Sequence, residues 1–213
     1  MRLLPLLVLA LLASTPVKAD ETALIRQLAP AINPAAVSEA VSAMKCAQKN
    51  GVGEEASRLA IIDYTIPSRQ QRLWVLDLKN RKLLFEEHVA HGQGSGEDIP
   101  NAFSNRNGSH QTSLGLFLTD ETYEGGNGYS LRLQGLSRGF NESAMERLIV
   151  MHGAPYVNPT AAAKMGRLGR SWGCPAVRTA VAQPMIDTLK MSSCKTENLS
   201  LASVSGLRKA NNG

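Results

Sequence analysis

Two different spacings of hydrophobic residues divide the chain. From Asp20 to Gly51, apolar positions recur every three or four residues, as they do along one face of a helix. Asn33 is a suitable N-cap, Pro34 suits the first helical position, and glycine follows the expected end. The pattern predicts a helical segment over residues 20–55, which we expect to be an accessory to the remaining chain.

Short strand-like runs replace the helical spacing from Arg58 onward. "RLAIIDYTI", "QRLWVLDL" and "KLLFEEHVA" are rich in β-branched and aromatic residues, and "KNR" joins the last two as in a hairpin. "TSLGLFLT", "YSLRLQGL" and "RLIVMHG" are further predicted strands. Between the two groups lies the loop "GQGSGEDIPNAFSNRNGSHQ", and loops of this length are often functional.

Three helical patterns lie among and after the later strands. "NESAMERL" starts at a potential cap, Asn141, and "NPTAAAKMG" runs from the cap Asn158 to a glycine stop. "TAVAQPMIDTLKM" also reads as a helix, and Pro184 is expected to confine its regular part to the C-terminal end. These patterns place one domain over residues 56–200 and a tail over residues 201–213 that we expect to be partly disordered.

The first nineteen residues have the layout of a secretory signal peptide. Arg2 gives a positive start, Leu3–Ala13 is apolar, and small residues precede Ala19. The apolar run is shorter than the roughly 20 residues that span a bilayer. We expect cleavage after Ala19 and no membrane span in the mature chain; an uncleaved membrane anchor is the alternative.

Length and charge narrow the class of protein. With 213 residues, 43% of them hydrophobic, the chain can form one soluble globular domain with a real core. Loss of Arg2 and Lys18 with the leader lowers the formal charge from +5 to +3. This mild excess does not indicate nucleic-acid binding, although it suits an anionic substrate. No histidine pair has metal-ligand spacing such as HExxH, so no metal site is expected.

Three cysteines cannot all pair within one chain. Export makes disulfides possible, and Cys46 and Cys194 both lie near the ends of helix-like segments. We therefore expect a Cys46–Cys194 disulfide and a free thiol at Cys174. A leftover thiol in an exported protein indicates catalysis or an intermolecular disulfide.

Cys174 lies in a turn, "GRSWGCPAV", whose composition suits a nucleophile. Gly173 would let a carbonyl group approach the backbone N–H groups that hold an oxyanion. Ser171 could hydrogen-bond within the turn and fix its shape. Pro175 would stiffen the exit from the turn.

A thiol nucleophile needs a base to take its proton. His152 ends the apolar strand "IVMHG", so a rigid element would hold it in place. On spacing alone, a structural histidine is an equal explanation. His91 and His110 bracket the long loop and compete for the same role, whereas His88 is expected to be a surface or packing residue.

"HG" followed by a loop and "SxGC" resembles the L,D-transpeptidase (YkuD-like) catalytic domain, in particular its branch with "SWGCPA" at the nucleophile. "RLWVLDL", "KLLFEEHVAHGQGSG", "SLGLF", "GYSLRLQGL" and "GFN" are similar to the family's sheet and loop segments in the same order, over about residues 58–189. The resemblance implies a mainly β (α+β) fold, a β-sandwich with peripheral helices. It implies that His152 is the base and Cys174 the nucleophile.

The resemblance also implies a substrate and a location. Peptidoglycan stem peptides would be attacked at the carbonyl after the diamino acid, in the periplasm or cell envelope, without metal or organic cofactor. An amine of a second stem would then resolve the thioester. Hydrolysis with water as acceptor, or a non-catalytic wall-binding protein, are the alternatives. The acceptor, the diamino acid and the oligomeric state are left open.

Two positions depart from the family's pattern. Many members have histidine, lysine or arginine where Trp172 stands, and arginine where Ala176 stands. Contact with a substrate carboxylate is therefore expected from Arg170, which flanks the turn; a solvated loop charge is the alternative. Trp172, Gly153 and His91 are the other positions expected to contact substrate.

Overall fold

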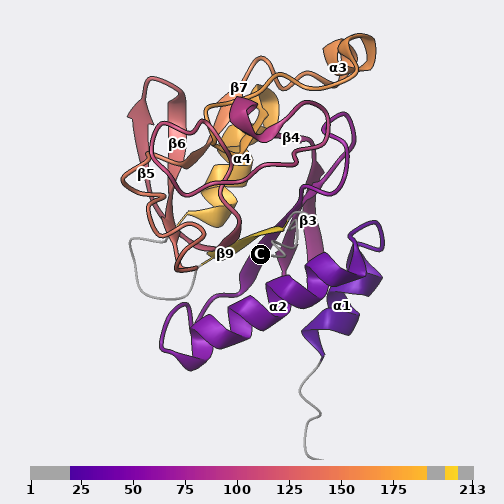
Figure 1. Cartoon of the computed structure of the whole chain (residues 1–213). Helices are drawn as coiled ribbons and strands as arrows, with labels where there is room; N and C mark the ends of the chain where they lie inside the picture. The colour runs from indigo at the N-terminus through magenta and orange to yellow at the C-terminus, as the bar shows by residue number, and fades with distance from the viewer. Residues whose placement is uncertain (1–19, 191–199, 206–213) are drawn as a thin grey trace, which may run out of the picture.

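A computed structural model describes residues 20–190 and 200–205 (Figure 1). Its helices are α1 (Glu21–Leu28), α2 (Pro34–Lys49), α3 (Pro159–Met165) and α4 (Thr179–Leu189), with a 3-10 turn η1 (Gln93–Ser95). Its strands are β1 (Arg58–Asp63), β2 (Leu73–Asp77), β3 (Lys82–Glu87), β4 (Val89–Ala90), β5 (Gly115–Gly125), β6 (Gly128–Gly135), β7 (Val150–Ala154), β8 (Ala176–Arg178) and β9 (Ser200–Ser205). Within these ranges, no helix is both long and apolar enough to cross a bilayer.

The described strands form one mixed sheet in the order β3-β2-β1-β9-β5-β6-β7-β8-β4. Its two outermost strands, β3 and β4, are separated in the chain by His88 alone. The sheet therefore curls until its edges adjoin, and Leu73 of β2 and Val177 of β8 belong to one buried core that α4 also lines. The predicted mainly β fold of sandwich type is confirmed.

A second core lies on the outer face of the same sheet, under α1 and α2 (Figure 1). Because side chains alternate along a strand, Ala60 and Ile62 of β1 enter the inner core, whereas Leu59 and Ile61 meet the helices. The predicted cap of α2 is present, since the side chain of Asn33 accepts a hydrogen bond from Ala35 N. The helices thus cover apolar sheet surface and are more than an accessory.

The predicted C-terminal tail is wrong in its first part. Residues 200–205 form β9, which pairs with β1 in parallel and with β5 in antiparallel register. "SLASVS" has only a weak strand pattern. Strand formation depends largely on the neighbouring strands, so a weak pattern can still form a strand. Here both neighbours are already strands, and they supply the partners for the backbone.

Two helix predictions also need correction. α4 begins at Thr179 and continues through Pro184. Proline has no N–H to donate to the carbonyl of Ala180. Because Ala180 is exposed, water can bond that carbonyl instead. "NESAMERL" forms successive turns and no helix. Asn141 is buried there, and its amide bonds Ser137 N and Leu116 O, so it ties the turns to β5 and caps nothing.

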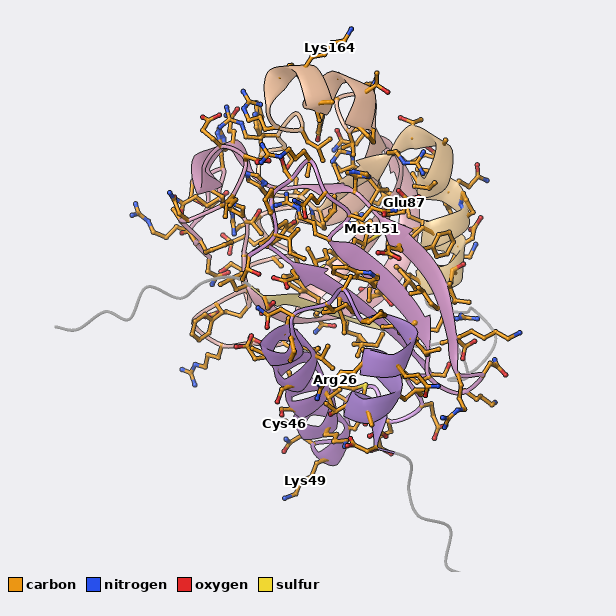
Figure 2. The ribbon with its side chains drawn as sticks, turned by 90° about the vertical axis from the view of Figure 1, so that its right-hand side faces the viewer. Arg26, Cys46, Lys49, Glu87, Met151 and Lys164 are labelled. Atoms are coloured by element: carbon orange, nitrogen blue, oxygen red, sulfur yellow. The ribbon has the colours of Figure 1, made fainter. Side chains whose placement is uncertain are left out.

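The predicted leader and disulfide fall partly outside the described ranges. Residues 1–19 and Cys194 are not described, so cleavage after Ala19 and the Cys46–Cys194 bond stay predictions. Cys46 is exposed on α2, at the end of the molecule far from Lys164 of α3 (Figure 2).

Candidate active site

Two neighbouring parallel strands bring Cys174 and His152 to one region of the sheet. His152 of β7 stands opposite Ala176 of β8, two residues after the cysteine. Adjacent strands lie about 4.8 Å apart. The long excursion through α3 between β7 and β8 therefore separates the two residues in sequence and leaves them close in space.

Ser171 fixes the turn that carries the cysteine. Its Oγ donates to the carbonyl of Cys174 at 2.6 Å and accepts from the N–H of Gly173 at 3.1 Å. Its backbone N–H donates to the carbonyl of His91 at 2.9 Å. The predicted role of Ser171 agrees with these bonds.

Gly173 is held inside the turn, and the approach of a substrate carbonyl that was expected here stays a prediction. Its N–H is engaged by Ser171, so this group is not a free donor for an oxyanion. Its φ of 122° is rarely adopted by other residues, and a Cβ would lie 2.8 Å from the carbonyl oxygen of Gln111. Glycine is needed here because the long loop packs directly against the turn.

The thiol of Cys174 is half-buried and donates to the carbonyl of Leu148 at 3.6 Å. Burial raises the pKa of the thiol, and this is opposed by a hydrogen bond from Val150 N–H and by the charge of Arg147. Since burial is the largest cause, the resting thiol is protonated at neutral pH. Ionisation therefore requires a base.

His152 is held as a neutral imidazole. Its Nδ1 lies 3.0 Å from the carbonyl oxygen of Gly153, so we assign the proton to Nδ1 and leave Nε2 as the acceptor. Its side chain is only 4% exposed, and burial lowers its pKa against the opposing effect of this hydrogen bond. No hydrogen bond joins the imidazole to the Cys174 thiol in the described part of the chain. Such bonds often form only once substrate is bound.

His91, which was expected to contact substrate, is buried in the protein interior. It is 0% exposed, and its Nδ1 lies 2.7 Å from Nη2 of Arg72, whereas Nε2 lies 3.3 Å from the carbonyl of Gly96. Burial, followed by the charge of Arg72, lowers its pKa to about 4. With both ring nitrogens engaged, His91 supports the turn through its backbone and cannot serve as the base.

His110 stands on the outer side of the turn. Its ring stacks on Trp172 with centroids 4.8 Å apart and planes 7° apart. Trp172 is 71% exposed, so its other face is open at the rim of the nucleophile turn. Contact of Trp172 with substrate stays a prediction. His88 bonds the carbonyl of Arg69 and is placed away from the turn, between β3 and β4.

The two other predicted substrate contacts already have partners within the protein. Arg170 donates to Gly96 O at 2.9 Å and to Glu97 at 2.8 Å. A substrate carboxylate would have to compete with Glu97, although an exposed ion pair of this kind is weak. A Cβ on Gly153 would lie 2.8 Å from Cβ of Ala182, so this glycine serves the close packing of α4 on β7.

Arg147 is the residue that the sequence analysis missed. It lies in the last of the turns before β7. It donates from Nη1 to Ser104 O at 2.6 Å and to Ser113 Oγ, and from Nη2 to Gln111 O at 2.7 Å. Nη2 also bonds Ser109 Oγ at 3.2 Å. A lone arginine in a polar run reads as a solvated charge, and no sequence signal distinguishes it from one.

Comparison with known proteins gives a family match. Residues 28–196 match a family model described as the L,D-transpeptidase catalytic domain, and the matched range includes α2. No curated protein sequence matches the chain. Two solved structures that match are the helical cell shape determining protein Pgp2 of Campylobacter jejuni, at 12% identity and a TM-score of 0.45, and an L,D-transpeptidase of Xylanimonas cellulosilytica, at 14% and 0.36. The alignments cover 72% and 70% of this chain and 48% and 61% of those chains, which is under two thirds of either.

Proposed function

Because the chain belongs to the L,D-transpeptidase catalytic domain family, we propose that it is a cysteine acyltransferase acting on peptidoglycan stem peptides. The observation that supports this best is the register of β7 and β8, which brings the buried neutral His152 near the turn of Cys174. A binding protein would not need a thiol and an imidazole arranged in this way.

Acylation begins when Nε2 of His152 takes the proton of the Cys174 thiol. The sulfur then attacks the carbonyl carbon that follows the diamino acid, and the negative charge moves to the carbonyl oxygen. The hydrogen bonds of the described residues leave the backbone N–H of Cys174 without a partner, so this group is the available donor to the oxyanion. The C–N bond breaks, His152 protonates the leaving amine of the terminal D-residue, and a thioester remains.

The second half returns the enzyme to its starting state. An amine of another stem peptide attacks the thioester while His152 accepts its proton. The C–S bond breaks, and the sulfur takes the proton back. Water in place of the amine would release a shortened stem without a crosslink, and the mass of the muropeptide products distinguishes the two acceptors.

The same proposal places the protein outside the cytoplasm. We propose that the leader is removed after Ala19 and that the mature chain works in the periplasm or cell envelope, where its substrate would lie. N-terminal sequencing of protein isolated from cells tests this, and a mature chain that begins at Met1 would contradict it.

Formation of an acyl-enzyme tests the chemistry. The protein from Asp20 onward is incubated with a stem peptide or a carbapenem, and the adduct is measured by intact mass. Cys174→Ala is expected to form none, and His152→Ala is expected to react about 10²–10⁴-fold more slowly. His88→Ala is the matched control and should react normally. An adduct on Cys174→Ala would show that the nucleophile is another residue.

A further inference from the structure

Arg147 carries a positive charge beside the nucleophile turn. A side chain on Gly173 would come within 3.4 Å of its Nη2, so the guanidinium lies directly against the residue before the nucleophile. Across the described ranges, several arginines pair with carboxylates, among them Arg170 and Arg178, whereas Arg147, like Arg58 and Arg72, forms no ion pair. The negative charge that acts on the Arg147 guanidinium is the one that Cys174 forms when it ionises.

The guanidinium also fastens the long loop to the turn. Its two terminal nitrogens reach four oxygens, on Ser104, Ser109, Gln111 and Ser113. The carbonyl of Gln111 is also the group that leaves no room for a side chain on Gly173. Loop, guanidinium and nucleophile turn thus form one continuous contact, and a planar fork of donors suits several fixed acceptors at once.

The backbone that follows Arg147 reaches the sulfur itself. Leu148, the next residue, accepts the thiol hydrogen bond and has a φ of 55°, which leucine rarely adopts. Such a conformation persists only where surrounding contacts impose it. The hydrogen bonds from Arg147 to the loop, here called the clamp, are contacts of this kind, since they fix the chain immediately before Leu148.

We propose that Arg147 is a positioning residue for the nucleophile, which holds a fixed positive charge beside Cys174 and thereby favours its thiolate. The electrostatics agree with the geometry. Burial lowers the pKa of Arg147 and the charge of the Cys174 thiolate opposes this, while Arg147 in turn opposes the rise in the pKa of the thiol. The inference rests on the proposed function only in taking Cys174 as the nucleophile.

The pH dependence of alkylation tests the role of the charge without any acyl donor. Rates with iodoacetamide are measured from pH 5 to 11 for the protein from Asp20 onward. Arg147→Gln keeps donors for the loop but removes the charge, and its alkylation midpoint is expected to rise by about one pH unit. Rates below both midpoints should then fall about tenfold, with an unchanged plateau at high pH. Arg147→Lys keeps the charge and should keep the midpoint.

The control is Arg138→Gln, an exposed arginine on the same run of turns, which should leave the profile unchanged. An unchanged midpoint in Arg147→Gln overturns the proposal, as does an Arg147→Lys midpoint that rises as far as that of Arg147→Gln. If Arg147→Gln fails to fold, the wild-type profile is measured at low and at high salt: screening of the guanidinium should raise the midpoint, and an unchanged midpoint overturns the proposal. Because no acyl donor is used, a chain that alkylates as expected and fails to form an acyl-enzyme contradicts the proposed function alone.

Discussion

His91 shows how a single buried residue supports the turn that carries Cys174. Its ring lies between Arg72 and the carbonyl of Gly96, and its own carbonyl accepts the N–H of Ser171. Nδ1 must accept from the guanidinium, which is possible only in the neutral ring. Arg72 is fully buried and lies over the ring of Tyr64 at 4.7 Å. The turn therefore depends on a histidine that stays uncharged.

Acid should destabilise the protein through His91. Its pKa is about 4 in the folded chain against 6.5 ordinarily, so below pH 6.5 the unfolded chain binds a proton that the folded chain does not. The contribution of neutral His91 to the free energy of unfolding is fully present above pH 6.5 and is lost as the pH falls toward 4. This loss has an upper limit of about 3 kcal/mol. Urea unfolding between pH 7.5 and 4.5 measures this. His91→Gln should flatten the dependence and His88→Gln should not; parallel losses in wild type and His91→Gln would contradict the assignment.

The resting state of the thiol gives a second prediction at this scale. Because burial raises the pKa of Cys174 and lowers that of His152, the pair should rest as neutral thiol and neutral imidazole. The iodoacetamide midpoint of the wild-type protein should lie above that of the free peptide "SWGCPA". A midpoint below that of the peptide would instead indicate a preformed thiolate–imidazolium pair.

At the scale of elements, α4 packs against the strands that position His152 and Cys174. It begins at Thr179, directly after β8, and packs on β7 at Gly153, where there is no room for a Cβ. A movement of α4 therefore acts on β8 and, two residues before that strand, on Cys174. The position of α4 is thus linked to the site both by this close contact with β7 and by its direct connection to β8.

Gly153→Ala should destabilise the fold by about 1–3 kcal/mol, since the new Cβ would lie 2.8 Å from that of Ala182. Ala182→Gly removes the clash but costs about 1 kcal/mol as a glycine within a helix. The double variant should therefore be more stable than the sum of the single changes predicts. Thermal or urea unfolding of the four proteins measures the coupling, and strict additivity would show that the two residues do not meet.

At the scale of the whole molecule, the last described strand completes the sheet. β9 lies between β1 and β5, in the middle of the strand order, and Ala202 is buried in the inner core. Strands from the start and the middle of the domain are thus joined by residues near the end of the chain. Long-range pairing of this kind is associated with slow folding.

Ala202→Pro tests this dependence on β9. Proline cannot donate to the ladder and is not tolerated in a central strand, so the loss should be large compared with the roughly 5–15 kcal/mol that stabilises a typical domain. Circular dichroism on heating is the measurement, and Ala202→Ser is the matched control, which should stay folded. A proline variant that melts with the wild type would mean that the sheet does not need β9.

The sequence alone determined the features that depend on local spacing. Alternation and helical periodicity located most strands and the N-terminal helices, whereas His152 and Cys174 were selected through the resemblance that "HG" and "SWGCPA" bear to a known family. Ser171 was predicted correctly because a hydroxyl acts on backbone groups within two or three residues. In strands, helices and the Ser171 turn, the interacting groups are close in the chain.

Only the tertiary structure decided the features that depend on distant partners. β9 is a strand because β1 and β5 flank it, and His91 is buried because Arg72 lies beside it. Arg147 reaches four oxygens about 34 to 43 positions earlier in the chain. Contacts over such separations leave no periodicity in the sequence, because the burial and charge that define each residue's role are supplied by other elements when the sheet closes.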